Sequence, residues 1–349
     1  METLIQNNFE RILVIQTAFL GDVLLTLPVA HHLKKINSAY KVTFLIKKEL
    51  SQIREIYNGI DDFILIDKSK YISSIFEIVS KIKNKYDVVI SPHRSARSAL
   101  ISYLSNSKVR ISFDKSSLNF LYSHLVTYRN DHHEIQRNLG LLSYFTNNIN
   151  WKERIKLNLD DYIFNDKFML WKTSKEKIVV IAPGTLWETK RYPEYYFAAL
   201  VKKLIDDGIK IVLIGSSEDF EIGLKIEKYV NSQNHFLNLI GKLKLKESIS
   251  LINLSDLLIC NDSAPIHMGI FTETPVLAIY GSTIPEFGFY PFREFDRIVQ
   301  IENLYCKPCG IHGYKKCPEK HFRCMIDLKP EIVYKNAIEI LNKPNSSIS

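Results

Sequence analysis

The polar turn at residues 261–267 gathers several side chains that could bind an anion. A short apolar run precedes it and predicts a buried strand. Pro265 follows where the first turn of a helix tolerates proline, because the missing N–H has no partner there. A strand that leads into a helix N-terminus presents backbone N–H groups and the positive end of the helix dipole, which suits phosphate. Asp262, Ser263 and His267 would surround this point, since Ser263 and His267 are four residues apart and share a helix face.

The composition is that of an ordinary globular protein with a basic surface. The chain has 349 residues, 46% of them hydrophobic, which suggests two domains. Its net charge of +8 implies an anionic partner, which could be nucleic acid, an acidic membrane surface or a phosphorylated substrate. No apolar run is long enough to predict a transmembrane helix, and the polar start does not resemble a signal peptide. We therefore expect a cytoplasmic protein.

Strands alternate with helices in two successive series, which predicts an α/β protein with two doubly wound parallel sheets. In the first series we expect strands at 11–16, 42–46, 62–66, 88–90 and 109–113, and helices at 22–35, 50–57, 72–83, 96–104 and 133–144. In the second we expect strands at 177–182, 211–214, near 237, 257–260 and 275–280, and helices at 193–206, 220–230, 246–254, 265–271 and 330–341. Ligands bind outside the carboxyl ends of such strands, so we expect the two halves to face a cleft.

The polar segment at 146–173 is the best candidate for a domain boundary. We expect an N-terminal Rossmann-like domain at 1–160 and a C-terminal one at 170–349, which includes a Cys-rich segment at 306–324.

Three segments, at 15–28, 182–194 and 261–267 with its continuation at 278–285, together resemble glycosyltransferase family 9. They read Ile-Gln-Thr-Ala-Phe-Leu-Gly-Asp-Val-Leu-Leu-Thr-Leu-Pro, Ala-Pro-Gly-Thr-Leu-Trp-Glu-Thr-Lys-Arg-Tyr-Pro-Glu, and Asn-Asp-Ser-Ala-Pro-Ile-His followed by Ala-Ile-Tyr-Gly-Ser-Thr-Ile-Pro. The family comprises the ADP-heptose:lipopolysaccharide heptosyltransferases, and the resemblance is to its heptosyltransferase II branch. It covers most of the chain in the same order.

The resemblance implies a GT-B fold with an N-terminal acceptor-binding domain and a C-terminal donor-binding domain. It implies an inverting transferase that moves heptose from ADP-heptose to the lipopolysaccharide inner core and needs no metal for catalysis. The acceptor would be a lipid-linked core oligosaccharide, and the basic surface would meet anionic lipid at the inner membrane, where the enzyme would be peripheral.

Asp22 is the candidate general base. An inverting transfer needs a group that takes the proton of the acceptor hydroxyl as its oxygen attacks the anomeric carbon. From position alone, an acidic residue in a first helical turn more often complements the helix N-terminus. The resemblance, in which Asp22 matches the loop aspartate of the family, favours the catalytic interpretation.

The donor diphosphate would be held by cations and helix N-termini, because they can stabilise the leaving group's charge without a metal. Lys190 matches the donor-binding lysine of the family, whereas Arg191 remains undecided and a solvated basic loop is the alternative for both. Thr185 and Thr189 could add hydroxyl donors. The other donor-binding residues that the resemblance implies are Asp262, Ser263, Ala264 and His267, with Asp219 for the ribose and Leu243 for the adenine.

Three of these donor-site positions have other interpretations. Ser263 could be a plain helix N-cap, and His267 could be a histidine of the core. Ala264 stands where the family usually has glycine, which bears on how closely the diphosphate approaches the backbone.

The acceptor side is predicted from His93, Arg94 and Arg97, which follow a strand's carboxyl end and could bind phosphates or acidic sugars. The segment at 132–137 also resembles a family segment in this domain. Surface salt bridges are an equally weighted alternative for both groups.

Four of the five cysteines, Cys306, Cys309, Cys317 and Cys324, could form a structural zinc site. Only the first pair has tight ligand spacing, so reduced thiols in a compact loop are the alternative.

Three other functions stay open. A family 9 transferase could use another nucleotide sugar, and a GT-B-like nucleotide-sugar epimerase would need no lipid acceptor but further carboxylates and histidines in its cleft. A basic nucleic-acid-binding protein should interleave aromatic residues with Lys and Arg on one face. No such stripe is present, so we expect no nucleic-acid partner.

Overall fold

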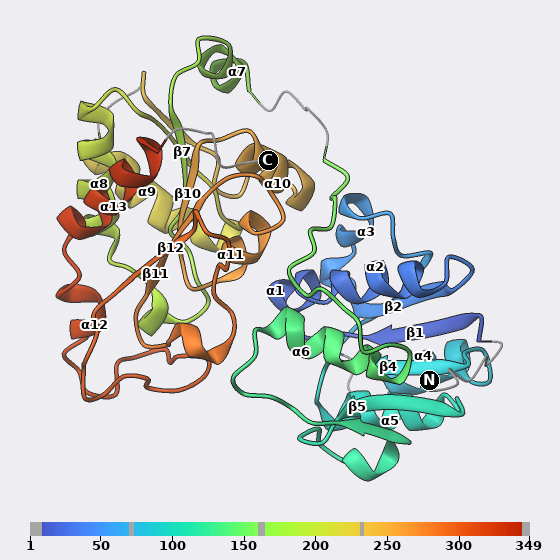
Figure 1. Cartoon of the computed structure of the whole chain (residues 1–349). Helices are drawn as coiled ribbons and strands as arrows, with labels where there is room; N and C mark the ends of the chain where they lie inside the picture. The colour runs from blue at the N-terminus through green and yellow to red at the C-terminus, as the bar shows by residue number, and fades with distance from the viewer. Residues whose placement is uncertain (1–8, 70–72, 160–164, 231–233, 344–349) are drawn as a thin grey trace. The chain divides into compact units, whose positions relative to one another are not determined.

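The computed structural model describes residues 9–69, 73–159, 165–230 and 234–343 and divides after Asn158 into two compact units (Figure 1). Each unit contains one six-stranded sheet whose neighbouring strands are all parallel. The predicted α/β architecture with two doubly wound sheets is confirmed. Among the described residues, no helix has both the length and the apolar character that a membrane crossing requires.

The N-terminal sheet has the strand order β3-β2-β1-β4-β5-β6. Its strands are β1 (Arg11–Ile15), β2 (Lys41–Lys47), β3 (Asp62–Ile66), β4 (Val88–Ser91), β5 (Val109–Phe113) and β6 (His124–Val126). The helices of this unit are α1 (Leu20–Leu24), α2 (Leu27–Ile36), α3 (Ile53–Ile56), α4 (Ser73–Ile82), α5 (Ala96–Leu104) and α6 (Glu134–Gly140), with 3-10 turns η1 (Lys48–Leu50), η2 (Asn119–Leu121) and η3 (Leu141–Tyr144).

The C-terminal sheet has the strand order β12-β11-β10-β7-β8-β9. Its strands are β7 (Ile178–Ala182), β8 (Lys210–Leu213), β9 (Phe236–Asn238), β10 (Leu257–Asn261), β11 (Val276–Tyr280) and β12 (Arg297–Gln300). The helices are α7 (Asp166–Thr173), α8 (Glu194–Asp206), α9 (Phe220–Val230), α10 (Leu245–Asn253), α11 (Ala264–Gly269), α12 (Arg323–Ile326) and α13 (Pro330–Leu341), with η4 (Glu188–Lys190), η5 (Ser217–Asp219) and η6 (Pro285–Phe287).

The central strands are apolar on both sides because helices cover both faces of each sheet. Alternate residues of β1, Leu13 and Ile15, pack in one cluster with Ile78 of α4 and Ile101 of α5. The helices α2 and α6 pack against each other, and Figure 1 shows them on the side of the sheet away from α5. In the C-terminal unit, α8, α9 and α13 share a core with β7, β10 and β11. Parallel strands bring their carboxyl ends to one edge of each sheet, and the loops at these edges carry the candidate site residues.

The differences from the predicted elements have local causes. The helix expected at 22–35 is two helices, α1 and α2, because Pro28 lies in the first turn of α2 and cannot donate a backbone hydrogen bond to a preceding turn. The edge strands β6 and β12 were missed because they are short and mostly unburied. Helix α7 was also missed, within the polar segment that was predicted as the domain boundary.

Candidate active site

Asp22 lies at the start of α1, directly after β1 and its loop. Its Oδ2 accepts a hydrogen bond from the backbone N–H of Phe19 at 3.0 Å. Its backbone carbonyl accepts a second bond, from Thr26 Oγ1 at 2.8 Å. The carboxylate therefore does complement the helix N-terminus, and the same bond fixes its orientation at the carboxyl edge of the sheet. The two interpretations of Asp22 are compatible.

The start of α6 contributes a second carboxyl group near Asp22. Glu134 is buried and pairs with Arg137, with 2.9 Å between Oε2 and NH1. Burial raises the pKa of Glu134 to about 6; Arg137 opposes this rise, and the nearby charge of Asp22 adds to it. The residue belongs to the 132–137 segment, but its type alone did not indicate a buried acid beside Asp22.

His93 is held at the carboxyl end of β4 by hydroxyl groups. Its Nδ1 lies 3.0 Å from Thr17 Oγ1 and 2.9 Å from Ser98 Oγ. Burial and, to a smaller extent, the surrounding cations together lower the pKa of His93 to about 4. His93 is therefore neutral at neutral pH.

Four cations surround His93: Lys47, Lys68, Arg94 and Arg97. Two of them rest on aromatic rings, Lys47 at 4.5 Å from the centroid of Phe19 and Arg94 at 4.1 Å from that of Tyr128. Burial, Lys47 and Arg97 lower the pKa of Lys68 to about 8, and the Glu49 carboxylate opposes this shift. The structure thus brings the predicted residues together and adds two lysines.

Lys47 and Lys68 were missed because an isolated lysine carries no motif. Their positions could have indicated them as site residues. Lys47 lies at the carboxyl end of β2, and Lys68 lies just beyond the carboxyl end of β3.

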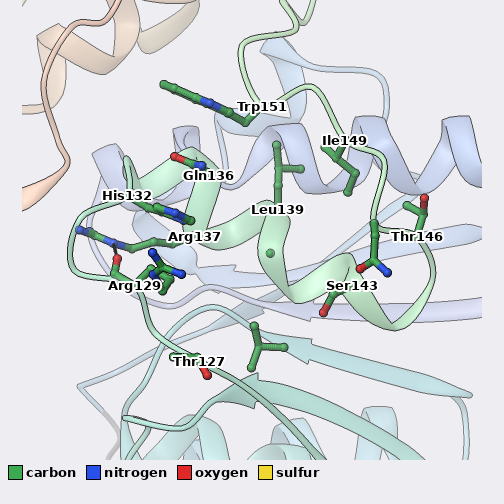
Figure 2. A pocket seen from close by; sticks show the side chains of 13 residues that line it. Thr127, Arg129, His132, Gln136, Arg137, Leu139, Ser143, Thr146, Ile149 and Trp151 are labelled. Atoms are coloured by element: carbon green, nitrogen blue, oxygen red, sulfur yellow. Dashed lines mark hydrogen bonds between the residues drawn. The ribbon is translucent and has the colours of Figure 1, made fainter.

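A cavity of about 330 Å³ opens elsewhere in the N-terminal unit, between α6, the end of β6 and the 146–151 segment (Figure 2). His132, Gln136, Arg137 and Trp151 line it, and the first three belong to the predicted 132–137 segment. Asp22, His93, Arg94 and Arg97 do not line it. Arg137 also donates to the backbone carbonyls of Arg129 and Asn130, both at 2.7 Å. Its guanidinium is therefore committed to the protein.

In the C-terminal unit, Lys190 and Asp262 form a nearly buried ion pair. Lys190 Nζ lies 2.6 Å from Asp262 Oδ2, and the two side chains are 13% and 8% exposed. Thr283 Oγ1 donates to the same carboxylate oxygen at 2.6 Å. These residues follow β7, β10 and β11, so three strand ends meet at one point. Thr283 was missed, although it lies within the segment that continues the family resemblance.

Thr189 connects three loops around this pair. Its Oγ1 accepts from Ser282 Oγ at 3.0 Å and from the backbone N–H of Tyr314 at 2.8 Å. Gly313 has a φ of +83°, and a Cβ there would lie 3.0 Å from Thr189 Oγ1. Only glycine both adopts this positive φ without strain and leaves room for the Thr189 hydroxyl. The predicted donor hydroxyl of Thr189 therefore has a role in the structure, holding the Cys-rich loop beside Lys190.

Thr185 and Arg191 close the loop between β7 and η4. An NH2 group of Arg191 donates to the backbone carbonyl of Thr185 at 2.8 Å, and NH1 binds Glu188 at 2.7 Å. The role of Arg191 was undecided from the sequence; in the structure its side chain holds this loop together through these two contacts.

Ser263, Ala264 and His267 lie at the start and on the inner side of the short helix α11. Ser263 Oγ makes no cap hydrogen bond to α11, contrary to the plain N-cap alternative, and instead lies 3.4 Å from the carbonyl of Gly184. Burial lowers the pKa of His267 to about 3, and the Lys190 charge acts in the same direction. The histidine is neutral, and its Nδ1 is one of the buried polar atoms for which the described residues supply no hydrogen-bond partner.

Asp219 lies after β8, against the loop that follows β7. Its Oδ2 accepts from the backbone N–H and the hydroxyl of Ser216, both at 2.9 Å. A Cβ on Gly184 would lie 2.1 Å from Asp219 Oδ1, so the carboxyl group rests directly on the glycine backbone. Leu243 lies in the partly exposed loop between β9 and α10. Both residues stand at the same sheet edge as Lys190.

The cysteines are not arranged as a zinc site in this structure. Cys306 Sγ lies 3.8 Å from His321 Nε2, and Cys309 Sγ donates to the Cys306 carbonyl at 3.1 Å. Within the described part of the chain, which includes all five cysteines, no three His, Cys, Asp or Glu side chains are grouped so that they could hold a metal ion. Burial raises the pKa of Cys324 to about 12, which keeps it a thiol.

The two parallel six-stranded sheets have the GT-B fold, which this chain shares with solved glycosyltransferases. The chain belongs to glycosyltransferase family 9 (heptosyltransferase), whose family model matches residues 75–321. The predicted family and enzyme class are confirmed.

Curated relatives are heptosyltransferases. Lipopolysaccharide heptosyltransferase 2 of Escherichia coli is 30% identical over 166 residues, 46% of either chain. The enzyme of the same name from Salmonella typhimurium is 28% identical over 176 residues, so the chain spans about half the length of these two relatives. Lipooligosaccharide heptosyltransferase 2 of Haemophilus influenzae aligns over 95% of this chain and 99% of its own, at 23% identity.

Two solved structures share the fold. The E. coli ADP-heptose lipopolysaccharide heptosyltransferase II has a TM-score of 0.75 at 19% identity and covers 95% of this chain and 98% of its own. A glycosyltransferase family 9 protein from Veillonella parvula has a TM-score of 0.78 at 23% identity, with 97% and 99% covered.

Proposed function

We propose that this protein transfers heptose from ADP-heptose to the lipopolysaccharide inner core with inversion at the anomeric carbon. The observation that carries the proposal is the nearly buried ion pair between Lys190 and Asp262, in a chain of the heptosyltransferase family. Asp262 lies directly before α11. The C-terminal unit binds the donor, and the N-terminal unit supplies the base and binds the acceptor. The acceptor is a lipid-linked core oligosaccharide at the cytoplasmic face of the inner membrane.

Lys190 stabilises the charge that develops on the diphosphate as it leaves. Its ammonium group is already oriented by Asp262, which Thr283 holds in turn, so little reorganisation is needed when the donor binds. Neutral His267 can donate one N–H to a phosphate oxygen. The backbone at Ser263 and Ala264 lies beside it, while Asp219 and Leu243 take the ribose and the adenine.

Asp22 acts as the general base. Its carboxylate accepts the proton of the acceptor hydroxyl while the hydroxyl oxygen bonds to the anomeric carbon. The bond from that carbon to the diphosphate oxygen breaks in the same displacement, and ADP leaves with the bonding electrons. The Phe19 N–H bond keeps the carboxylate oriented through this step.

The acceptor's phosphates or acidic sugars bind to the cations around His93. Arg94, Arg97, Lys47 and Lys68 concentrate positive charge at one sheet edge, and a bound anion would relieve their mutual repulsion. His93 stays neutral there and serves as a hydrogen-bonding group.

The test is ADP release by the purified protein given ADP-heptose and a heptose-deficient lipopolysaccharide core. Asp22→Asn retains an oxygen that can accept the Phe19 N–H bond but cannot take a proton, so turnover should fall by about 10²–10⁴-fold. Glu247→Gln is the matched control. It makes the same change at the start of α10, where Glu247 accepts from the Lys244 N–H at 2.6 Å, and it should leave turnover unchanged.

Release that needs the acceptor, persists in EDTA and collapses in Asp22→Asn supports a metal-independent inverting transfer. Turnover only with a different nucleotide sugar would reject the heptose assignment, and conversion of the sugar without any acceptor would identify an epimerase. Equal activity of Asp22→Asn and wild type would remove Asp22 from the base role.

A further inference from the structure

Exposed apolar side chains gather on α5 and η2 of the N-terminal unit. Three of its side chains, Leu100, Tyr103 and Leu104, lie on the outer stripe of α5 at helical spacing. Leu118 and Phe120 lie at η2, and Phe120 is 75% exposed while Tyr103 is 51% exposed. We call these five residues the α5–η2 face. An outer helix stripe normally carries polar residues, so this face is unusual.

The α5–η2 face is a single fixed surface. η2 packs against α5, and the backbone N–H of Ser117 donates to the Arg94 carbonyl at 2.9 Å. Arg110 spans the two parts, because its Nε donates to the Leu121 carbonyl at 3.0 Å and NH1 to the Ser107 carbonyl at 2.5 Å. The same guanidinium lies 5.8 Å from the centroid of the Tyr103 ring. The apolar side chains are therefore exposed on an ordered scaffold.

The chain around this face is strongly basic. Residues 94–128 contain Arg94, Arg97, Lys108, Arg110 and Lys115, and the one acidic residue among them is Asp114. Asp114 Oδ1 accepts the backbone N–H of Tyr128 at 2.9 Å, so its carboxylate has a structural use.

Exposed apolar and aromatic side chains in a chain segment rich in Lys and Arg match the boundary of an anionic bilayer. Acyl chains accept the apolar side chains, and the headgroups attract the cations. A second copy of this chain fits less well, because it would bring its own cations against those of the first.

We propose that the α5–η2 face docks this protein on an anionic lipid bilayer. The reason for such docking rests on the proposed function, in which the acceptor is linked to a lipid. Helix α5 begins beside Arg94 and Arg97 and ends in the apolar face. Docking would therefore place the acceptor-binding edge close to the lipid headgroups.

The test is co-sedimentation of the full chain with vesicles of phosphatidylethanolamine and phosphatidylglycerol, compared with phosphatidylcholine alone. The double variant Leu100→Ser/Phe120→Ser should bind the anionic vesicles about tenfold more weakly than wild type. The matched control is Leu170→Ser/Tyr229→Ser, which removes two side chains of the C-terminal unit that are 65% and 64% exposed. It should bind like wild type.

A charge variant and a depth probe sharpen the result. Lys108→Gln/Lys115→Gln should reduce the preference for anionic vesicles, and added salt should weaken wild-type binding. Phe120→Trp should gain fluorescence that brominated acyl chains quench.

Equal vesicle binding by wild type and Leu100→Ser/Phe120→Ser would overturn the proposal, as would no wild-type binding. A dimer in sedimentation velocity that the same substitutions dissociate would assign the face to self-association instead. Vesicle binding needs no turnover, so it can succeed or fail independently of the proposed reaction. If the proposed reaction and the proposed docking are both correct, Leu100→Ser/Phe120→Ser should still act on acceptor dispersed in detergent. It should lose activity only on acceptor held in vesicles.

Discussion

The two sheets carry differently organised charge at their carboxyl edges. In the C-terminal unit Lys190 is bound by Asp262 at 2.6 Å, so cation and carboxylate largely cancel. In the N-terminal unit Lys47, Lys68 and Arg94 gather around His93, and no ion pair with a carboxylate joins them among the residues described there. Both edges keep a histidine neutral beside cations, His267 in one and His93 in the other.

The difference indicates what each edge is built to bind. An ion pair whose charges cancel can be buried and kept oriented. This suits the diphosphate of a donor and the negative charge that develops on the diphosphate as it leaves. A group of like charges is unfavourable until an anion arrives, which suits an acceptor that carries its own negative charge. The predictions below test this contrast.

Lys190→Ala should have the largest effect, because it removes the leaving-group cation and leaves the Asp262 carboxylate, 8% exposed, without its charged partner. We expect kcat/KM for the donor to fall by about 10²–10³-fold. The free energy of unfolding should fall by about 3 kcal/mol, measured by denaturant titration.

The double variant Lys190→Ala/Asp262→Asn separates these two effects. It should recover much of the lost stability, because no buried charge remains, but none of the turnover. Recovery of turnover in the double variant would show that Lys190 serves only to neutralise Asp262.

The neutral histidines should make stability fall in mild acid. Their folded pKa values, about 4 for His93 and about 3 for His267, lie below the ordinary 6.5, so their contribution is present above 6.5 and is lost as the pH falls toward the folded values. Between pH 6.5 and about pH 5, each should cost about 2 kcal/mol of unfolding free energy. His93→Gln and His267→Gln should each flatten this dependence in urea titrations at several pH values. An unchanged slope would mean that the replaced histidine is protonated as readily in the folded chain as in the unfolded one.

Lys68→Ala should act on the acceptor alone. Because it relieves repulsion with Lys47 and Arg97, we expect unchanged or slightly higher stability, in contrast to Lys190→Ala. The KM for the acceptor should rise about tenfold while donor affinity stays constant. Lys81→Ala is the control, since Lys81 is an exposed lysine paired with Glu77 within α4. An equal rise of KM in both variants would reduce the effect to general surface charge.

The sequence predicts these edges only in part, for physical reasons. Buried strands such as Leu257–Asn261 are short apolar runs between turn residues, so their local pattern identifies them. The edge strands β6 and β12 are mostly unburied and lack that pattern, because they are stabilised by pairing with β5 and β11. Lys190 was named from the family resemblance and Asp262 first from the polar turn that it belongs to, but no local pattern reveals that they bind each other. Lys68 and Thr283 become site residues only when distant strand ends meet.

The smallest effect concerns the cysteines and should change neither turnover nor stability. Cys306 and Cys317 are partly exposed, whereas Cys260 and Cys324 are buried. Burial raises the pKa of Cys324 to about 12, so at neutral pH almost none of it is the reactive thiolate. Iodoacetamide should therefore label Cys306 and Cys317 before Cys324, as read by mass spectrometry of peptides, and EDTA should not alter the order. The opposite result would be that all four cysteines resist labelling until EDTA is added and that elemental analysis finds one zinc per chain. It would show that this loop closes around a metal and that the thiol arrangement described above is wrong.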